Sequence, residues 1–541
     1  MSYVTGTHTM KVGYQHALMT DDRTWMTNNQ ALTYQVNNGV PNQLTQSISP
    51  WVNNARAGWD ALFAQEQWTR GKLTLQGALR FDRAGSWFPT QREGPSRFLP
   101  TPITIPETRG IDSYTDLTPR FGIAYDVTGR GTTALKMSLG KYLEGVGTSG
   151  IYAATNPTSR MPQTTPVFGP AGVTRAWIDA NRNFAPDCNL LSPNAQDLRT
   201  SGGDLCGVLS NVSFGTNVMT NAFDDGVLSG WDVRPSDWNL AVSVQQQIGR
   251  RSSVDVSYSR RSFRGFTVAD NLSVSSSDFT PFSVVAPRDP RLPGGGGYIV
   301  GGLYDVVPGK AGQVDNFIAD SGQYGEWSQY SNALDLTVEA RIQDRLTIVG
   351  GSSTGQTVAD NCAVRQRLPE LATTMTNTTA FGAGLMTSAV TPVSPYCHVA
   401  FGVLTQVRGL STYRVPKLEV EVAGTFQTKP GAMLAANYAA PNSVVAPSLG
   451  RNLSGNADTV TVNLVAPGSL YGDRITEFDL RVAKVFSSGR YRTVIGADIF
   501  NLLNSNAVLT YNNTFVSEGP WLQPLTVLTP RLWKVTAAFD W

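Results

Sequence analysis

Short segments in which apolar and polar residues alternate recur along the whole chain, and no other feature of the sequence restricts the fold as strongly. In "ALDLTVEARI", Leu334 and Leu336 fall on one face of an extended strand, while Asp335 and Thr337 fall on the other. The segments "KLEVEVAGTF" and "SVDVSYSRR" follow the same rule. A sheet whose two faces differ produces this alternation. The sequence therefore predicts an all-β protein.

The connections between these segments fall into two length classes. Between the short connections lie long excursions rich in Gly, Pro and Asn, the longest at residues 145–235. A compact soluble domain rarely contains loops of that length. Short turns at one end and long loops at the other are typical of an antiparallel up-and-down transmembrane β-barrel, with the turns in the periplasm and the loops outside. The short connections are "RGK" (70–72), "TGRGT" (128–132), "GRRS" (249–252), "QDR" (343–345), "VPK" (415–417) and "SSGR" (487–490).

Counting from the first residue gives 16 candidate strands, an even number that returns the last strand to the periplasm. The segment "NNGVP" at residues 37–41 fits either a turn between the second and third strands or part of a longer loop. The predicted strands are residues 4–18, 32–36, 43–49, 59–69, 73–83, 117–127, 133–144, 237–249, 253–269, 327–342, 346–358, 401–414, 418–428, 474–486, 491–509 and 531–541.

Composition excludes two other classes of protein. Charged residues make up 16% of the chain and the formal net charge is +2, so no broad basic field attracts nucleic acid, and we expect no nucleic-acid partner. The chain has no stretch of 18 consecutive apolar residues, which argues against a helical membrane protein. A membrane β-barrel needs only every second strand residue to be apolar, and the composition is compatible with one.

Four cysteines form two close pairs, Cys188 with Cys206 and Cys362 with Cys397. Neither pair has the spacing of a CxxC motif or of a zinc finger. Pairs within loops rich in Gly, Pro and Asn indicate disulfides and hence an oxidising compartment. Buried free thiols are the alternative.

The sequence predicts no enzyme. "GSSTG", residues 351–355, satisfies the G-x-S-x-G pattern of serine hydrolases, but that motif requires a helix after the turn, and here the segment continues as a strand. We therefore expect no catalytic residue, no metal site and no cofactor.

Several aromatic residues lie in or beside the predicted loops. Exposed aromatic rings suit stacking on sugars or flat chelates, so these side chains are candidate contacts for an extracellular ligand. Alternatively, they hold the loops together. The candidates are Trp87, Phe88, Trp177, Tyr298, Tyr304, Tyr396 and Trp521.

Four segments resemble the TonB-dependent outer-membrane receptors, and within them the Oar-like branch, whose full-length members carry a carboxypeptidase-regulatory-like domain. They are "DALFAQEQWTRGKLTLQGALRFD", "LTPRFGIAYDVTGRGTTALKMSLGKYLE", "DPRLPGGGGYIVGGLYDV" and "DLRVAKVFSSGRYRTVIGADIFNLLNSNAV". The terminal strand "LWKVTAAFDW" resembles the signal, here Phe539 and Trp541, that assembly machinery reads on unfolded barrels.

The resemblance implies a barrel of 22 strands around a plug domain, a signal peptide and a TonB box. None of these amino-terminal parts is evident here, so we expect residues 1–541 to be the carboxy-terminal barrel portion only. A truncated gene, a processed product and a genuinely short protein all fit this pattern. Charged residues on the lumen side would face plug and water; they are Asp255, Asp335, Glu339, Arg341, Glu419, Glu421, Asp479 and Arg481.

Three functions follow as hypotheses for a protein of the bacterial outer membrane. The first is the barrel of a receptor that binds and imports an unknown extracellular solute, with outer-membrane lipid, the barrel assembly machinery and, through the missing amino-terminal part, the TonB system as partners. The second is a structural or assembly subunit that pairs with a separate amino-terminal chain or a surface partner. The third is a passive porin, which 16 strands would suit.

Overall fold

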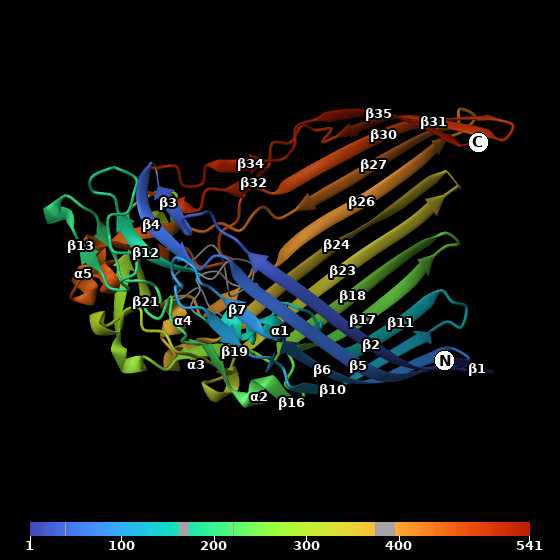
Figure 1. Ribbon diagram of the computed structural model, residues 1–541. Coiled ribbons are helices and arrows are strands. Elements are labelled where there is room, and N and C mark those ends of the chain that lie inside the picture. The colour runs from blue at the N-terminus through green and yellow to red at the C-terminus, as the bar shows by residue number, and fades with distance from the viewer. Residues whose placement is uncertain (38, 162–171, 220, 344, 374–394, 541) are drawn as a thin grey trace.

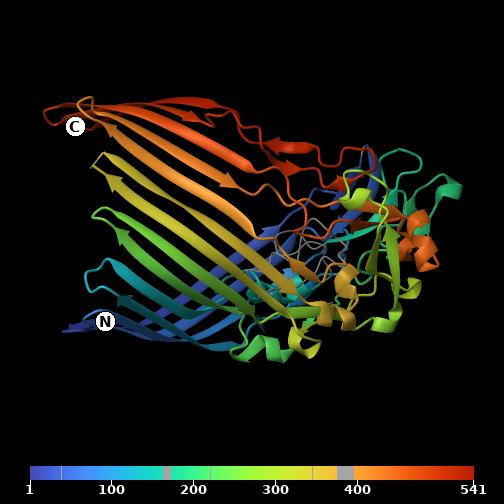
Figure 2. The ribbon, with the colours of Figure 1, turned by 180° about the vertical axis from the view of Figure 1, so that it is seen from behind.

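The protein is described by a computed structural model that covers residues 1–541 apart from 38, 162–171, 220, 344, 374–394 and 541. Its largest sheet has 18 strands among the described residues, four of them short and fourteen long. We call the fourteen long strands the wall. Each pairs antiparallel with the next long strand in the sequence, and the wall curves round in space (Figures 1 and 2).

The wall strands are β2 (His8–Trp25), β5 (Trp51–Arg70), β6 (Leu73–Phe88), β10 (Ser113–Asp126), β11 (Thr133–Leu143), β17 (Ser236–Ile248), β18 (Ser252–Arg264), β23 (Ser328–Ile342), β24 (Leu346–Asp360), β26 (Leu404–Val415), β27 (Val420–Lys429), β30 (Ile475–Ser488), β31 (Tyr491–Phe500) and β35 (Leu532–Asp540). The short members of the sheet are β1 (Ser2–Thr5), β9 (Thr108–Arg109), β16 (Ser229–Trp231) and β25 (His398–Ala400).

All six short connections lie at the same end of the wall, as the sequence predicts (Figure 1). The turns after β5 and β30 each contain two residues, and each begins with a glycine in the left-handed region, Gly71 (φ 58°) and Gly489 (φ 59°). Glycine adopts that conformation without steric cost, which allows such tight hairpins. The local sequence therefore sets where the wall turns.

The predicted number of 16 wall strands is wrong, because residues 32–36 and 43–49 do not join the wall. They form β3 (Leu32–Asn37) and β4 (Val40–Ser47), which pair with each other in a separate five-stranded sheet. With 6 and 8 residues, these strands are shorter than the ~9–11 residues that a membrane-spanning strand needs. Their apolar residues Leu32 and Leu44 are buried in a protein core.

The first predicted strand also differs from the structure, because residues 4–18 contain a hairpin. β1 folds back on the start of β2, with Ser2 opposite Lys11 and Thr5 opposite His8. Among the described residues, no pairing joins β35 to β1 or β2, so the two outer edges of the sheet are not paired with each other.

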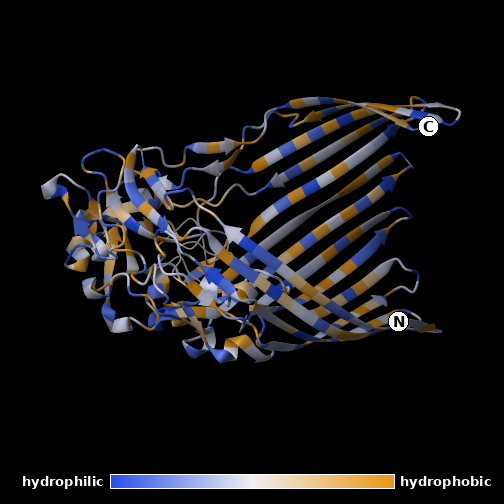
Figure 3. Ribbon diagram, in the orientation of Figure 1, coloured by the Kyte–Doolittle hydropathy of each residue, from blue (hydrophilic) through white to orange (hydrophobic). Residues whose placement is uncertain are grey.

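One face of the wall is apolar and exposed along its whole width, and the alternation along each strand is visible in Figure 3. Leu334 and Leu336 of β23 keep 54% and 41% of their surface exposed. Soluble proteins rarely expose apolar patches of more than a few hundred Å². Such a face therefore fits the hydrocarbon of a membrane. Other members are Leu62, Leu117, Phe121, Leu135, Val242, Val256, Val482, Ile495 and Val535.

The long connections fold together at the other end of the wall into a layer of small sheets and short helices (Figures 1 and 2). We call the described residues of 26–50, 89–112, 144–235, 265–327, 361–403, 430–474 and 501–531 the loop layer. Buried apolar residues concentrate there in four clusters, so most of the protein's hydrophobic core lies in the loops and not in the wall.

Further strands of the loop layer are β7 (Gln91–Glu93), β8 (Ile103–Ile105), β12 (Gly172–Ile178), β13 (Gln196–Asp197), β14 (Leu205–Cys206), β15 (Asn221–Phe223), β19 (Thr267–Asn271), β20 (Phe279–Val285), β21 (Ile299–Val306), β22 (Asn316–Asp320), β28 (Asn437–Pro441), β29 (Thr459–Asn463), β32 (Val508–Tyr511), β33 (Thr514–Phe515) and β34 (Pro524–Val527). The helices are α1 (Ile151–Ala154), α2 (Asp225–Leu228), α3 (Cys362–Arg367), α4 (Glu370–Thr373) and α5 (Asn442–Leu449). In the part of the chain that the structure describes, no helix has both the length and the apolar character to cross a membrane.

Candidate functional site

The largest core of the loop layer joins loops that follow three different wall strands. Trp521, 2% exposed, lies at its centre, and its indole N–H donates a hydrogen bond to the carbonyl oxygen of Ala435 (2.8 Å). The ring of Phe515 meets the Trp521 ring edge-on, with centroids 5.1 Å apart. The Arg291 guanidinium lies 5.5 Å from the ring centroid. Residues from loops 265–327, 430–474 and 501–531 thus form one folded unit.

A second core gathers the loops that follow β2, β6 and β11. Trp177 is 1% exposed there, and its indole N–H donates to the Asp204 carboxylate at 2.9 Å. The Arg175 guanidinium, almost fully buried beside this core, donates to the carbonyl oxygens of Gly207 and Asn194. Burial lowers the pKa of Arg175 to about 10.

The structure places the seven candidate aromatic residues in two groups. Phe88, Trp177 and Trp521 are buried, which leaves them out of reach of a solute in this arrangement. Trp177 and Trp521 belong to the two loop cores, whereas Phe88 ends wall strand β6. The other four are only partly buried: Tyr298 and Tyr396 donate their hydroxyl hydrogens to the carbonyl oxygens of Leu464 and Asn463, and Trp87 and Tyr304 keep part of their ring surface accessible.

Both predicted disulfides are present, and the described residues include no free cysteine. The Cys188–Cys206 bond lies within the second core and ties β14 to the loop before it. The Cys362–Cys397 bond ties α3 to the residue before β25. The oxidising compartment remains a prediction.

We expect the double replacement Cys188→Ser and Cys206→Ser to lower the free energy of unfolding of the loop layer by about 2–3 kcal/mol, because the bond closes a loop of 18 residues. Denaturant titration of the refolded chain would measure the change. Peptide mapping of secreted, unreduced protein should show the 188–206 and 362–397 linkages. Four free thiols in that material would contradict the pairing.

A buried glutamate lies where the loop after β6 meets the outer end of β5. Glu93 is 0% exposed, and both of its carboxylate oxygens accept a hydrogen bond from the backbone N–H of Val52, at 3.0 and 3.2 Å. Beside it, the side-chain amide of Gln91 donates a hydrogen bond to the side-chain oxygen of Asn156 (2.8 Å). This bond links the site to a third loop, the one that follows β11. Burial raises the pKa of Glu93 from 4.5 to about 8, although the hydrogen bond from Val52 partly opposes this rise.

Because the folded state holds the Glu93 proton more tightly than the unfolded chain, stability should fall as the pH rises from about 4.5 to about 8. Glu93→Gln should flatten this slope, which thermal unfolding at pH 5, 6.5 and 8 would measure. Glu107→Gln, which changes an exposed glutamate of the same loop, is the matched control. A slope that is the same in both variants would contradict the prediction.

The face of the wall opposite to the apolar face carries the charges that the sequence assigns to the lumen. The Asp479 carboxylate accepts a hydrogen bond from Thr425 (3.0 Å), and Arg481 binds both carboxylate oxygens of Asp498 (2.7 and 3.0 Å). Asp335 lies opposite Ser257 and Ser353 in the pairing register. Glu419 differs from the expectation, because it belongs to the turn before β27.

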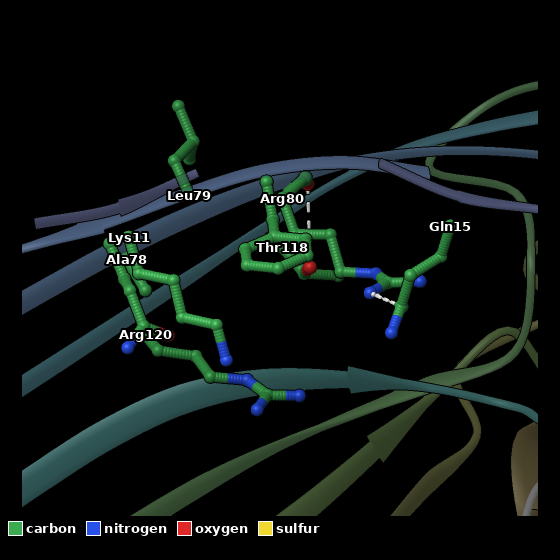
Figure 4. Close-up of a pocket in the computed structure, with 9 residues that line it drawn as sticks. Lys11, Gln15, Ala78, Leu79, Arg80, Thr118 and Arg120 are labelled. Atoms are coloured by element: carbon green, nitrogen blue, oxygen red, sulfur yellow. Dashed lines mark hydrogen bonds between the residues drawn. The ribbon is translucent and has the colours of Figure 1, made fainter. Parts of the chain in front are cut away.

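This inner face contains a pocket of about 260 Å³ between β2, β5, β6 and β10 (Figure 4). We call it the basic hollow, because three cations, Lys11, Arg80 and Arg120, line it. Figure 4 shows these side chains on one side of the sheet and Leu79 pointing to the other. The remaining lining residues are Gln15, Phe63, Gln65, Ala78 and Thr118.

The three cations differ in their partners. The Arg80 guanidinium binds both carboxylate oxygens of Asp82 (2.9 and 3.0 Å) and donates to the side chain of Gln15. The Lys11 amine lies 5.9 Å from the Phe63 ring centroid, and the Arg120 guanidinium lies 4.4 Å from that of Tyr142. Within the described residues, neither Lys11 nor Arg120 has a carboxylate at ion-pair distance. The hollow therefore has two cations available for an anion.

A comparison with protein families decides the class of the chain. Residues 1–347 match the family described as the outer membrane beta barrel domain. The chain belongs to this family. This outer-membrane barrel domain accordingly resides in the bacterial outer membrane. A comparison with curated protein sequences finds no significant match.

Solved structures similar to the barrel domain cover nearly all of it at low sequence identity. The FrpB iron transporter from Neisseria meningitidis is 9% identical with a TM-score of 0.46, and the match covers 99% of this chain and 54% of that one. The siderophore receptor PiuA from Acinetobacter baumannii is 8% identical (TM-score 0.45, 99% and 54%). The ferric-catecholate import receptor Fiu from Escherichia coli K12 is 11% identical (TM-score 0.42, 99% and 52%). The barrel domain spans about half the length of these proteins.

Sequence reasoning missed the basic hollow of the barrel domain. Lys11, Arg80 and Arg120 each occupy a polar position of an alternating segment, which was the available signal. The three residues lie far apart in the sequence, however, and only the pairing of four neighbouring strands brings them to one place.

Proposed function

We propose that residues 1–541 form the barrel wall and the extracellular loop layer of a TonB-dependent receptor of the Oar-like branch. In this proposal the protein binds an extracellular solute and imports it across the outer membrane, without a catalytic step. The observation that carries the proposal is the folded loop layer, in which loops following different wall strands share hydrophobic cores. A folded layer over one end of the wall suits capture of a solute, whereas a passive porin needs an unobstructed entrance to its channel.

The proposal includes partners beyond the solute. Energy would come from the TonB system through an amino-terminal part. The barrel assembly machinery would read the terminal aromatics Phe539 and Trp541. Phe539 is 64% exposed on the outward face, which supports this role, and Trp541 lies outside the described residues.

A second candidate is a structural or assembly subunit that pairs with a separate amino-terminal chain. The observation in its favour is the pair of sheet edges, at β35 and along β2 beyond β1, for which the structure shows no pairing among its described residues. Open edges of this kind accept further strands.

The test compares the source bacterium with a strain that lacks the gene, both grown in yeast extract whose components are followed by mass spectrometry. We expect one solute, or one chemical group of solutes, to persist in the medium of the deletion strain, and the wild-type gene to restore its uptake. Deletion of tonB should cause the same defect. A defect that tonB deletion does not reproduce would contradict the receptor and favour a porin. Unchanged consumption of every component would favour the structural subunit.

A further inference from the structure

The basic hollow is built by one row of side chains that crosses four wall strands. Lys11 pairs with Gln65, Gln65 with Ala78, and Ala78 with Arg120, so two cations stand at the ends of the row. The methyl group of Ala78 between them fills little space, which leaves room above the sheet. Adjacent strands are about 4.8 Å apart, so the backbones of Lys11 and Arg120 are three spacings, or about 14 Å, apart. Their long side chains reach into the space between them and line the same pocket from its two sides.

The next row closes the hollow on one side. There Gly13 pairs with Phe63, Phe63 with Arg80, and Arg80 with Thr118. The Phe63 ring lies directly over Gly13. A side chain at position 13 would collide with it, since a Cβ atom there would come within 2.5 Å of the ring. The hollow is thus bounded by the Phe63 ring, the Arg80 guanidinium and the side chains of Lys11 and Arg120.

The hollow brings together two cations that lack acidic partners within the described chain, unlike several arginines elsewhere on the inner face. Two arginines elsewhere on this face are paired with acids, Arg261 with Asp237 (2.8 Å) and Arg481 with Asp498 (2.7 Å). In the hollow, Arg80 is paired with Asp82, but Lys11 and Arg120 have no acidic partner among the described side chains. Their two positive charges are not locally balanced, and low-dielectric walls strengthen the attraction for an anion.

The chemistry of the lining defines the ligand. An arginine fork and a lysine amine are the side chains that bind carboxylate and phosphate most strongly in proteins. The amides of Gln15 and Gln65 add neutral donors at the edge of the same pocket. A neutral or cationic group would leave the two charges unbalanced.

From this arrangement we propose that the basic hollow binds the anionic group of the imported solute, so that the receptor takes solutes bearing a carboxylate or phosphate. The inference rests on the proposed import function for its biological meaning. The binding site itself is a property of the wall. Lys11 and Arg120 bind the anion directly. Arg80, which Asp82 holds in place, contributes to the electrostatic potential of the site.

The experiment uses the full chain refolded in neutral lipid vesicles, with citrate and inorganic pyrophosphate as separate probes in isothermal titration calorimetry at low salt. We expect at least one of the two anions to bind, more weakly as salt concentration rises. Lys11→Gln and Arg120→Gln should each lower the association constant about tenfold, the effect expected for loss of one charged hydrogen bond. The stronger of the two probes identifies the class, carboxylate or phosphate.

Lys136→Gln is the matched control. Lys136 belongs to β11 and lies on the same inner face of the wall as Lys11 and Arg120, but outside the hollow, and its amine donates a hydrogen bond to Gln245 (2.6 Å). It should leave binding unchanged, and thermal unfolding of all three variants should show that each is folded. Absence of binding for both anions, or equal losses in the control and the hollow variants, would overturn the inference.

The same variants separate this inference from the proposed function. Returned to the deletion strain, the double variant Lys11→Gln and Arg120→Gln should slow uptake of the solute that depends on the gene. If that solute proves to be neutral or cationic, or if the double variant restores full uptake, the inference fails while the receptor function stands. If the deletion strain shows no uptake defect, the receptor function fails, and calorimetry alone decides whether the hollow binds anions.

Discussion

Replacing Leu336 with arginine is expected to lower the free energy of unfolding by about 2–4 kcal/mol, the cost of a charge placed near the middle of the lipid-facing side of a barrel. Leu336 lies midway along β23 and is 41% exposed in the apolar face. The arginine would have to leave water for hydrocarbon, and the register places Val256 and Ser352, not an acid, directly opposite this position. Denaturant titration of the chain folded in lipid vesicles measures the change.

The neighbouring position provides the control. Thr337 points to the inner face, where the register places it opposite Asp255. Thr337→Arg should therefore change the free energy of unfolding by no more than about 0.5 kcal/mol, as for an ordinary exposed site. Equal losses at the two positions would show that the face of Leu336 does not contact lipid.

The second large effect is expected in the loop layer. Trp521→Ala should remove about 3–5 kcal/mol from its stability, the range found when a large aromatic residue is deleted from a packed core. The variant also leaves the carbonyl oxygen of Ala435 without the indole donor and removes the ring beside Arg291. Hydrogen exchange and limited proteolysis should show opened loops above an intact wall.

Trp231→Ala is the comparison for this variant, because Trp231 is 66% exposed and its ring contacts that of Phe81 (centroids 5.8 Å apart). It should leave proteolysis of the loops unchanged. If Trp521 contacted solute directly, its replacement would weaken solute binding while the loops stayed protected. That result would contradict the structural role and restore the ligand role considered from the sequence.

The wall was largely predictable because its signals are local. Alternation over ten residues, as in β23, identifies two faces, and Gly71 and Gly489 mark hairpin turns without reference to the rest of the chain. The same alternation misled at β3 and β4. An apolar face has the same pattern whether it meets lipid or another protein surface, and only strand length hinted at the difference.

The loop aromatics show a second limit. The sequence indicates that Trp177 and Trp521 lie in loops but says nothing about what surrounds them. Their burial depends on β14 and on Ala435, which come from other parts of the chain. Packing between distant segments therefore decided that these two residues hold the loops together.

By itself, the sequence determined a membrane β-barrel with short turns at one end, long loops at the other and two disulfide-linked loop pairs, because periodicity, turn residues and cysteine spacing are properties of short segments. Only the tertiary structure decided that fourteen strands form the wall, that the loops share hydrophobic cores, and that Lys11 and Arg120 face one hollow. These properties depend on strand register and on contacts between residues far apart in the chain, and neither is encoded in any single segment.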